Sequence, residues 1–186
     1  MPFPTTSHKV RYLKKSARGL GMISVLLGMV IVALLTVTVF NQFTEAQRNA
    51  RIDEAKGQVA TIIGNAQKTY GAARQFGAVT TAMAINGGVI PASMRIGANA
   101  NNIYDAQIAI APVALVTAGD ALRLTYPVRP SDCQDLVLAN LNLVRQVTIG
   151  GVAVKPIDAA VNMGALNTQC NVAAAAVAVL FDFGFR

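Results

Sequence analysis

The sequence predicts an α+β fold, in which the second half of one long N-terminal helix packs against an antiparallel β-sheet. Three observations lead to this fold class: an uncharged run over residues 19–44, a helical stripe of apolar residues directly after it, and short alternating segments within residues 107–186. The 186 residues are enough for one domain. They are 53% hydrophobic and 13% charged, against about 25% charged in a typical soluble domain. This composition excludes a disordered chain and argues against a wholly soluble protein.

The positive charge of the chain is concentrated before the uncharged run. The net charge is +7, but five of the sixteen basic residues come first, with no acidic residue among them: Lys9, Arg11, Lys14, Lys15 and Arg18. Without residues 1–21, eleven basic residues face nine acidic ones, a net charge of +2. Basic residues that precede an apolar segment stay on the cytoplasmic side of a membrane. We therefore interpret residues 1–21 as a leader, and not as a nucleic-acid-binding surface, because no basic run with interleaved aromatic residues occurs elsewhere.

The uncharged run is long enough to cross a membrane. Leu20 to Phe40 is a stretch of 21 uncharged residues. The apolar core of a cleaved secretory signal has only about 7–15 residues, whereas about 20 residues span the hydrocarbon core of a bilayer. The sequence thus predicts a transmembrane helix over residues 22–44, which we call the apolar segment.

The helix is expected to continue beyond the apolar segment as an amphipathic helix over residues 45–76. Apolar residues recur there at spacings of three or four, which is the period of one helix face: Ile52, Ala55, Val59, Ile62, Ala66, Tyr70 and Ala73. No proline interrupts residues 5–90. We therefore predict one helix from Met22 to Gln75, with its second half packed on the rest of the chain.

Residues 77–186 are expected to form a globular α+β head. Residues 76–106 are rich in Gly, Asn and Ala and suggest a long surface connection with a turn or short helix. Alternation predicts one strand over Gln107–Leu115 and a second over residues 122–126, which Pro127 and Pro130 would end.

The remaining elements of the head follow from turn and capping signals. Ser131-x-x-Gln134 is a capping-box pattern that opens a helix, with Cys133, Val137, Leu141 and Val144 on one face. Residues 147–149 and 152–154 flank Gly150-Gly151, which predicts a hairpin with a two-residue turn. Phe181, Phe183 and Phe185 alternate with smaller or polar residues and predict a last strand. The sheet would therefore have about four strands.

The two cysteines, Cys133 and Cys170, fall in the part predicted to lie across the membrane. They are either two buried free thiols or a disulfide. The predicted topology places them in an oxidising compartment, which favours the disulfide. It would close a loop of 38 residues, a contribution of roughly 4 kcal/mol on the loop-entropy model.

A search for chemistry gives no catalytic residue, no metal site and no cofactor site. The single histidine, His8, lies in the leader, which excludes a Ser-His-Asp or Cys-His centre and His-based zinc sites in the rest of the chain. No nucleotide-binding glycine motif occurs. Asp132 and Asp135 are three residues apart in the first turn of a predicted helix, where acidic residues favour the helix dipole; the alternative is an acid/base pair.

The leader and the apolar segment together resemble a type IV prepilin. The resemblance rests on Lys14-Lys15-Ser-Ala-Arg18-Gly-Leu-Gly21, followed by Met22-Ile-Ser-Val-Leu-Leu and the long helix. Ser131-Asp-Cys133-Gln, the hairpin, Leu166-Asn-Thr-Gln-Cys170 and an aromatic last strand are similar to type IVb pilins, especially the PilS-type pilins of conjugative thin pili.

This resemblance implies how the chain is processed. A prepilin peptidase would cut after Gly21, with Gly19 as the weaker alternative, and Met22 would become an N-methylated N-terminus. Cys133 and Cys170 match the family's paired cysteines, which border its variable surface region. Most pilins carry a glutamate at the fifth mature residue, where this chain has Leu26.

The resemblance also implies a homopolymer, a helical filament for surface attachment or conjugative cell contact. The expected partners are the membrane, the prepilin peptidase, and the inner-membrane assembly platform with its motor, with no requirement for nucleic acid. The chain would first lie in the inner membrane, leader in the cytoplasm and head in the periplasm, and then in an extracellular pilus. The residues expected to form the filament-core helix are Val25, Leu26, Leu27, Met29, Val30, Ile31, Leu34, Leu35, Val39 and Phe40.

Two alternatives remain open at this point. The first is a minor pilin or type II secretion pseudopilin at a filament tip, with the same fold. The second is a single-pass, membrane-anchored binding domain outside the cytoplasm, because any single-pass anchor has a similar apolar segment.

Overall fold

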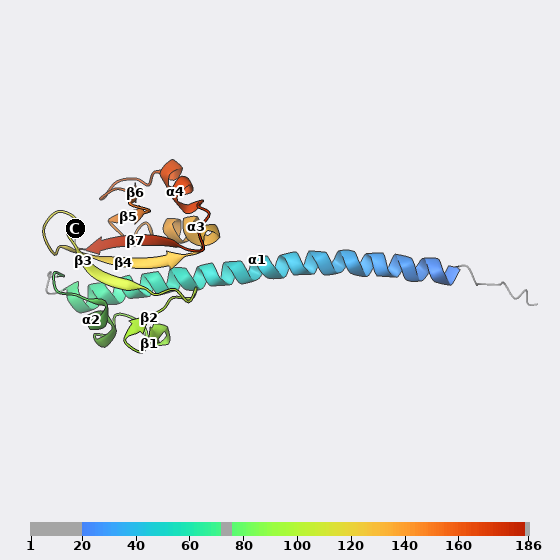
Figure 1. The fold of residues 1–186 in the computed structure, drawn as a ribbon, viewed down its shortest axis with the longest axis horizontal. Helices are drawn as coiled ribbons and strands as arrows, with labels where there is room; N and C mark the ends of the chain where they lie inside the picture. Colours follow the sequence, from blue (N-terminus) through green and yellow to red (C-terminus); the bar gives the residue numbers. More distant parts are fainter. Residues whose placement is uncertain (1–19, 72–75, 185–186) are drawn as a thin grey trace, which may run out of the picture. The chain divides into compact units, whose positions relative to one another are not determined.

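The structure is a computed structural model that describes residues 20–71 and 76–184 (Figure 1). The predicted leader therefore lies outside the described residues except for its last two positions, and so do His8, Gly19, Ala73 and Phe185. The chain forms two compact units, residues 1–46 and residues 47–186. We call them the N-terminal unit and the C-terminal unit.

The long helix, α1, runs without interruption from Leu20 to Tyr70. The prediction of one continuous helix is confirmed, but the helix ends five residues before the predicted Gln75. Gly71 directly follows and leaves the α-helical pattern. Glycine loses more backbone entropy in a helix than any other residue, so the end of the helix falls where the apolar stripe no longer offsets that cost.

The apolar stripe of α1 packs into the core of the C-terminal unit. Its first five described members, from Ile52 to Ala66, are buried, and Tyr70 is partly buried against the same core. The Tyr126 hydroxyl donates a hydrogen bond of 2.7 Å to Oε1 of Gln58, which ties α1 to the sheet. Figure 1 shows this part of α1 running beside the sheet.

The main sheet is antiparallel and has five strands in the order β3-β4-β7-β5-β6. The strands are β3 (Ala109–Val113), β4 (Ala121–Val128), β5 (Gln146–Ile149), β6 (Val152–Lys155) and β7 (Val177–Gly184). The predicted hairpin is confirmed, since Ile149 pairs with Val152 across Gly150 and Gly151. Both glycines have positive φ angles, +57° and +82°, as a two-residue hairpin turn requires.

The region predicted as a surface connection does contain a short helix, but it also contributes buried residues to the core, so the prediction of a purely surface segment is wrong. It contains α2 (Thr81–Asn86), a 3₁₀ helix (Ala92–Met94) and a small sheet of β1 (Arg95–Ile96) and β2 (Asn99–Ala100). Several of its apolar residues are buried in the main core, among them Phe76, Val79, Ala84, Val89, Ile90 and Met94, whereas Met83 and Ile96 are exposed. The glycines lie in the turns between these short elements, whereas Asn99 belongs to β2 and Asn102 is buried.

Pro127 does not end its strand, which corrects a second prediction. β4 continues to Val128, and Pro127 pairs with Ala178 of β7. On the other side of β4, pairing with β3 stops at Thr125, and the Pro127 carbonyl accepts a hydrogen bond from Nδ2 of Asn102. The backbone nitrogen of Pro127, which has no hydrogen to donate, therefore points away from β7 to a side where no strand pairs with it. A proline is tolerated at such a position.

The helix α3 (Pro130–Asn140) begins without the predicted capping box. Its N-cap residue is Arg129, whose side chain makes no capping hydrogen bond, and Pro130 occupies the first turn. The Ser131 hydroxyl instead donates to Oδ1 of Asp132 at 2.8 Å. Cys133 and Val137 are buried as expected, whereas Val144, also buried, lies beyond the end of the helix. A further helix, α4 (Met163–Cys170), precedes β7.

Asp182 is completely buried in β7, although it was expected only as a polar residue between two phenylalanines. Its two carboxylate oxygens accept hydrogen bonds from Nε and Nη2 of Arg123 at 2.7 and 2.8 Å. Such a paired geometry is the strong form of a carboxylate–guanidinium contact. In the register of β4 and β7, Arg123 lies directly opposite Asp182, which brings the two side chains into contact.

Replacement of Asp182 with asparagine is expected to lower the free energy of unfolding by about 3 kcal/mol. This value is at the lower end of the range for breaking a buried pair, because the side chain of Arg123 is one third exposed. Urea unfolding of the full chain in detergent, followed by circular dichroism, would measure it. Asp53→Asn, at an exposed pair with Lys56, is the matched control and should cost less than about 1 kcal/mol. Equal losses in the two variants would contradict the assignment.

Candidate functional site

The apolar segment presents a continuous apolar surface in the N-terminal unit. The ten residues predicted for the filament-core helix are all between 50% and 66% exposed. Among the described residues, α1 is the one helix long and apolar enough to cross a membrane, by length and composition. Exposed apolar surface of this extent marks a site of contact with lipid or protein. The predicted cleavage position lies on this helix too, and Met22 is 80% exposed.

Where the structure describes hydroxyl side chains of the apolar segment, at Ser24, Thr36 and Thr44, each donates to a backbone carbonyl of its own helix. Ser24 donates to the Gly21 carbonyl at 3.0 Å, and Thr36 donates to the Val32 carbonyl at 2.7 Å. A polar group in an apolar medium is costly unless it is hydrogen-bonded. These side chains therefore fit equally well in lipid or in a bundle of apolar helices.

A polar cluster joins α1 to α3 in the C-terminal unit. Nε of Arg48 donates to Oδ1 of Asp132 at 2.9 Å, and Nη2 donates to Oδ2 of Asp135 at 3.0 Å. The hydrogen bond to Asp132 is the main reason that the pKa of Arg48 is raised. The two acidic residues thus bind the same arginine. No local sequence pattern indicated this contact, because Arg48 lies 84 residues before Asp132.

Tyr104 completes this cluster from the opposite side of Asp132. Its hydroxyl donates to Oδ2 of Asp132 at 3.1 Å. Burial raises the pKa of Tyr104 strongly and the negative charge of Asp132 raises it further, whereas the guanidinium groups of Arg51 and Arg129 act in the opposite direction. The Arg129 guanidinium carbon lies 6.0 Å from the centre of the Tyr104 ring. Tyr104 is therefore a neutral hydrogen-bond donor between two cations and a buried carboxylate.

Cys133 and Cys170 form a disulfide that connects α3 to the end of α4, with Cα atoms 5.6 Å apart. The enclosed loop contains the β5–β6 hairpin and a buried lysine, Lys155. Nζ of Lys155 donates to the carbonyls of Val144 and Arg145 at 3.0 and 2.9 Å. The disulfide thus borders a region that is also held internally by hydrogen bonds.

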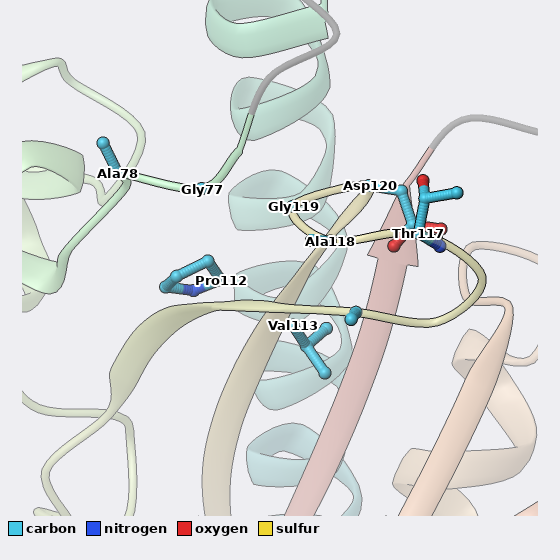
Figure 2. Close-up of a pocket in the computed structure, with 9 residues that line it drawn as sticks. Gly77, Ala78, Pro112, Val113, Thr117, Ala118, Gly119 and Asp120 are labelled. Carbon is cyan, nitrogen blue, oxygen red and sulfur yellow. Dashed lines mark hydrogen bonds between the residues drawn. The ribbon is translucent and has the colours of Figure 1, made fainter.

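An open depression of about 740 Å³ lies at the end of β3, and Figure 2 shows its lining. Its wall is a loop folded around Asp120, whose carboxylate accepts backbone N–H bonds from Leu115, Val116 and Thr117 at 2.8–3.0 Å. Burial acts to raise the pKa of Asp120, but these N–H bonds outweigh it, so the pKa is lowered. Gly119, with φ +73°, lies close to Gly77 across the depression, where a Cβ atom would come within 3.2 Å of the Gly77 backbone. The sequence did not indicate this loop.

The Asp120 loop is expected to lose stability in acid. The pKa of Asp120 in the folded state is below its ordinary value of about 4. The backbone hydrogen bonds to its carboxylate therefore stabilise the fold fully above that ordinary value. This stabilisation is lost as the pH falls through the lowered folded-state pKa. Asp120→Asn should lower the free energy of unfolding at pH 7 by about 1 kcal/mol, which urea unfolding measures. Between pH 6 and pH 3, this variant should lose less of its free energy of unfolding than the unmodified chain does. An acid profile of Asp120→Asn that matches the unmodified chain would refute the role of these bonds.

No three His, Cys, Asp or Glu side chains in the described parts of the chain come together as a metal site would require. The polar groups found here bind one another, and the apolar segment has the largest exposed apolar surface described. The apolar segment is therefore suited to associate with lipid or with other apolar helices.

Comparisons with known proteins agree with this picture. The family model described as "PilS N terminal" matches residues 49–181, more than half of the chain. Among solved structures, the chain is similar to TcpA, a type IV pilin from Vibrio cholerae El Tor biotype, with a TM-score of 0.56 and 15% sequence identity. The match covers 72% of this chain and 98% of that chain. At this identity the likeness shows the fold alone. No curated protein matches the sequence significantly.

Proposed function

This chain belongs to the PilS family of type IV pilins, a family of pilus structural subunits, and we propose that it polymerises through its apolar segment into a type IVb-like pilus. The pilus would serve surface attachment or conjugative cell contact. The observation that carries this proposal is the exposed apolar surface of the N-terminal unit. A helix that is apolar on all sides has two stable environments, lipid and a bundle of identical helices. Moving from one to the other does not expose the helix to water.

Maturation is the second part of the proposal. A prepilin peptidase removes residues 1–21, and Met22 becomes a methylated N-terminus. Removal of the leader takes away five basic residues that would otherwise hold the N-terminus in the cytoplasm. The apolar segment can then leave the membrane for the filament, with the help of an inner-membrane assembly platform and its motor.

The order of locations follows from the same charges. Before assembly the chain lies in the inner membrane, with the leader in the cytoplasm and the head in the periplasm, and after assembly it lies in an extracellular pilus. The Cys133–Cys170 bond supports this order, because disulfides persist in oxidising compartments such as the periplasm.

A second candidate function is a minor pilin or a type II secretion pseudopilin. Leu26 favours it, because the chain lacks the glutamate that most pilins carry at this position. The abundance of the chain in sheared surface filaments separates the two functions. A principal subunit dominates such a preparation, whereas a tip or priming subunit is a trace component.

Mass spectrometry of filaments sheared from cells would test the proposal. We expect a chain that begins at Met22 with a methylated amine and contains the disulfide. The substitution Gly21→Val should abolish cleavage and filaments, and Gly19→Val should leave both intact. A Cβ at Gly21 has open space around it, so the substitution does not disturb the packing. Filaments built from chains that retain His8, or normal assembly of Gly21→Val, would refute it.

A further inference from the structure

The apolar segment is followed by an acidic residue, Glu45, which is the one charged residue within residues 20–46. Its side chain is exposed, and among the described residues it takes part in no ion pair or hydrogen bond. The nearest cation on its own helix, Arg48, is already bound by Asp132 and Asp135. In the proposed polymer, Glu45 would lie where the packed apolar helices end, and a carboxylate that loses water there without a cation is costly.

Arg51 and Arg129 are among the cations of the C-terminal unit that form no ion pair with a described residue. Nε of Arg51, one turn beyond Arg48 on α1, is buried and has no hydrogen-bond acceptor. Glu54, the acid one turn further, accepts instead from Gln58 at 3.3 Å. Arg129 contacts the Tyr104 ring and forms no ion pair in the described structure. Arg51 as a residue is only partly buried, so part of it stays accessible to a neighbouring copy, and its charge has no carboxylate partner among the described residues.

We propose that Glu45 of one copy binds Arg51 of the neighbouring copy in the filament, with Arg129 contributing to the same anion-binding surface. This inference rests on the proposed polymerisation. The partner is a second copy of this chain, because every copy carries an unpaired acid and an unpaired base six positions apart on α1, so each copy in a row can offer one charge to each neighbour. It also supplies an ionic contact between neighbouring helices in a chain whose Leu26 provides none.

The contact also fixes the stagger between two touching helices. Residues 45 and 51 are six positions apart on a continuous helix, which is about 9 Å along its axis. A head-to-tail polymer keeps all copies in one orientation, so the neighbour must be displaced by about this distance for the two side chains to meet. An apolar surface alone tolerates many displacements, whereas one ion pair selects one of them.

Charge reversal tests the contact. Glu45→Arg and Arg51→Glu should each reduce sheared filaments at least about tenfold, as loss of one partner of an interface ion pair does, and the double variant should restore most of the yield. Glu45→Arg combined with Lys56→Glu is the matched control and should not restore it. Failure of the double variant to recover, with membrane levels of the chain unchanged, would overturn the proposal.

Disulfide trapping gives an independent readout. Cells that express Glu45→Cys and Arg51→Cys chains together should yield cross-linked dimers in their filaments, and cells that express either chain alone should not. A mixture of Glu45→Cys with Asp53→Cys should give none. Absence of the dimer in intact filaments refutes this contact while leaving the proposed function in place, whereas absence of filaments from the unmodified chain refutes the proposed function itself.

Discussion

Replacement of Val30 with aspartate is expected to abolish filaments. Val30 lies in the middle of the apolar segment, and its side chain is 57% exposed. A carboxylate there costs about 3 kcal/mol in the centre of a bilayer. It costs a similar amount or more in a bundle of apolar helices, because no lysine or arginine occurs within residues 20–46 and the amine of a mature Met22 would lie eight positions away on the helix. Both environments available to the segment thus become unfavourable.

Filament yield after shearing and the amount of chain in the membrane fraction are the two measurements. Val30→Leu keeps the apolar surface and should assemble normally. Thr61→Asp places the same charge at an exposed position of α1 in the C-terminal unit and should have little effect. If Val30→Asp still formed filaments in normal amounts, the apolar segment could not be the surface that drives assembly.

Removal of the disulfide is expected to have the largest effect on stability. The double substitution Cys133→Ser and Cys170→Ser opens a loop of 38 residues, counted with both cysteines, and should lower the free energy of unfolding by roughly 4 kcal/mol. The loss should appear first around α4, because the disulfide joins the end of this helix to α3. Urea unfolding of the full chain in detergent measures the total, and limited proteolysis locates the segment that opens.

Reduction of the unmodified chain provides the control for this second prediction. Treated with dithiothreitol, it should unfold at nearly the same urea concentration as the double variant, since both lack the same cross-link. The Asp182→Asn variant keeps the disulfide and should respond to reduction by a similar further loss, because Asp182 hydrogen-bonds Arg123 and not the cross-linked loop. Equal urea midpoints for oxidised and reduced chains would show that the bond does not stabilise the fold.

Sequence patterns predicted an element correctly where the residues that form the pattern lie close together in the chain. The continuous helix, the Gly150-Gly151 turn and the last strand each depend on neighbours in sequence, and the structure contains all three. Patterns failed where a distant contact overrode them. Pro127 stays within β4 because β3 stops short of it, and residues 76–106 enter the core because their few apolar side chains find partners on α1 and the sheet.

The sequence by itself determined the apolar segment and the amphipathic stripe after it, because periodicity, charge and composition act over one helix; it favoured the Cys133–Cys170 disulfide, which the structure contains. Only the tertiary structure decided which polar residues are joined. Arg48 reaches Asp132 across 84 positions, and Arg123 reaches Asp182 across 59. A charged side chain is exposed or buried according to the elements that pack around it, and that packing is a property of the whole fold.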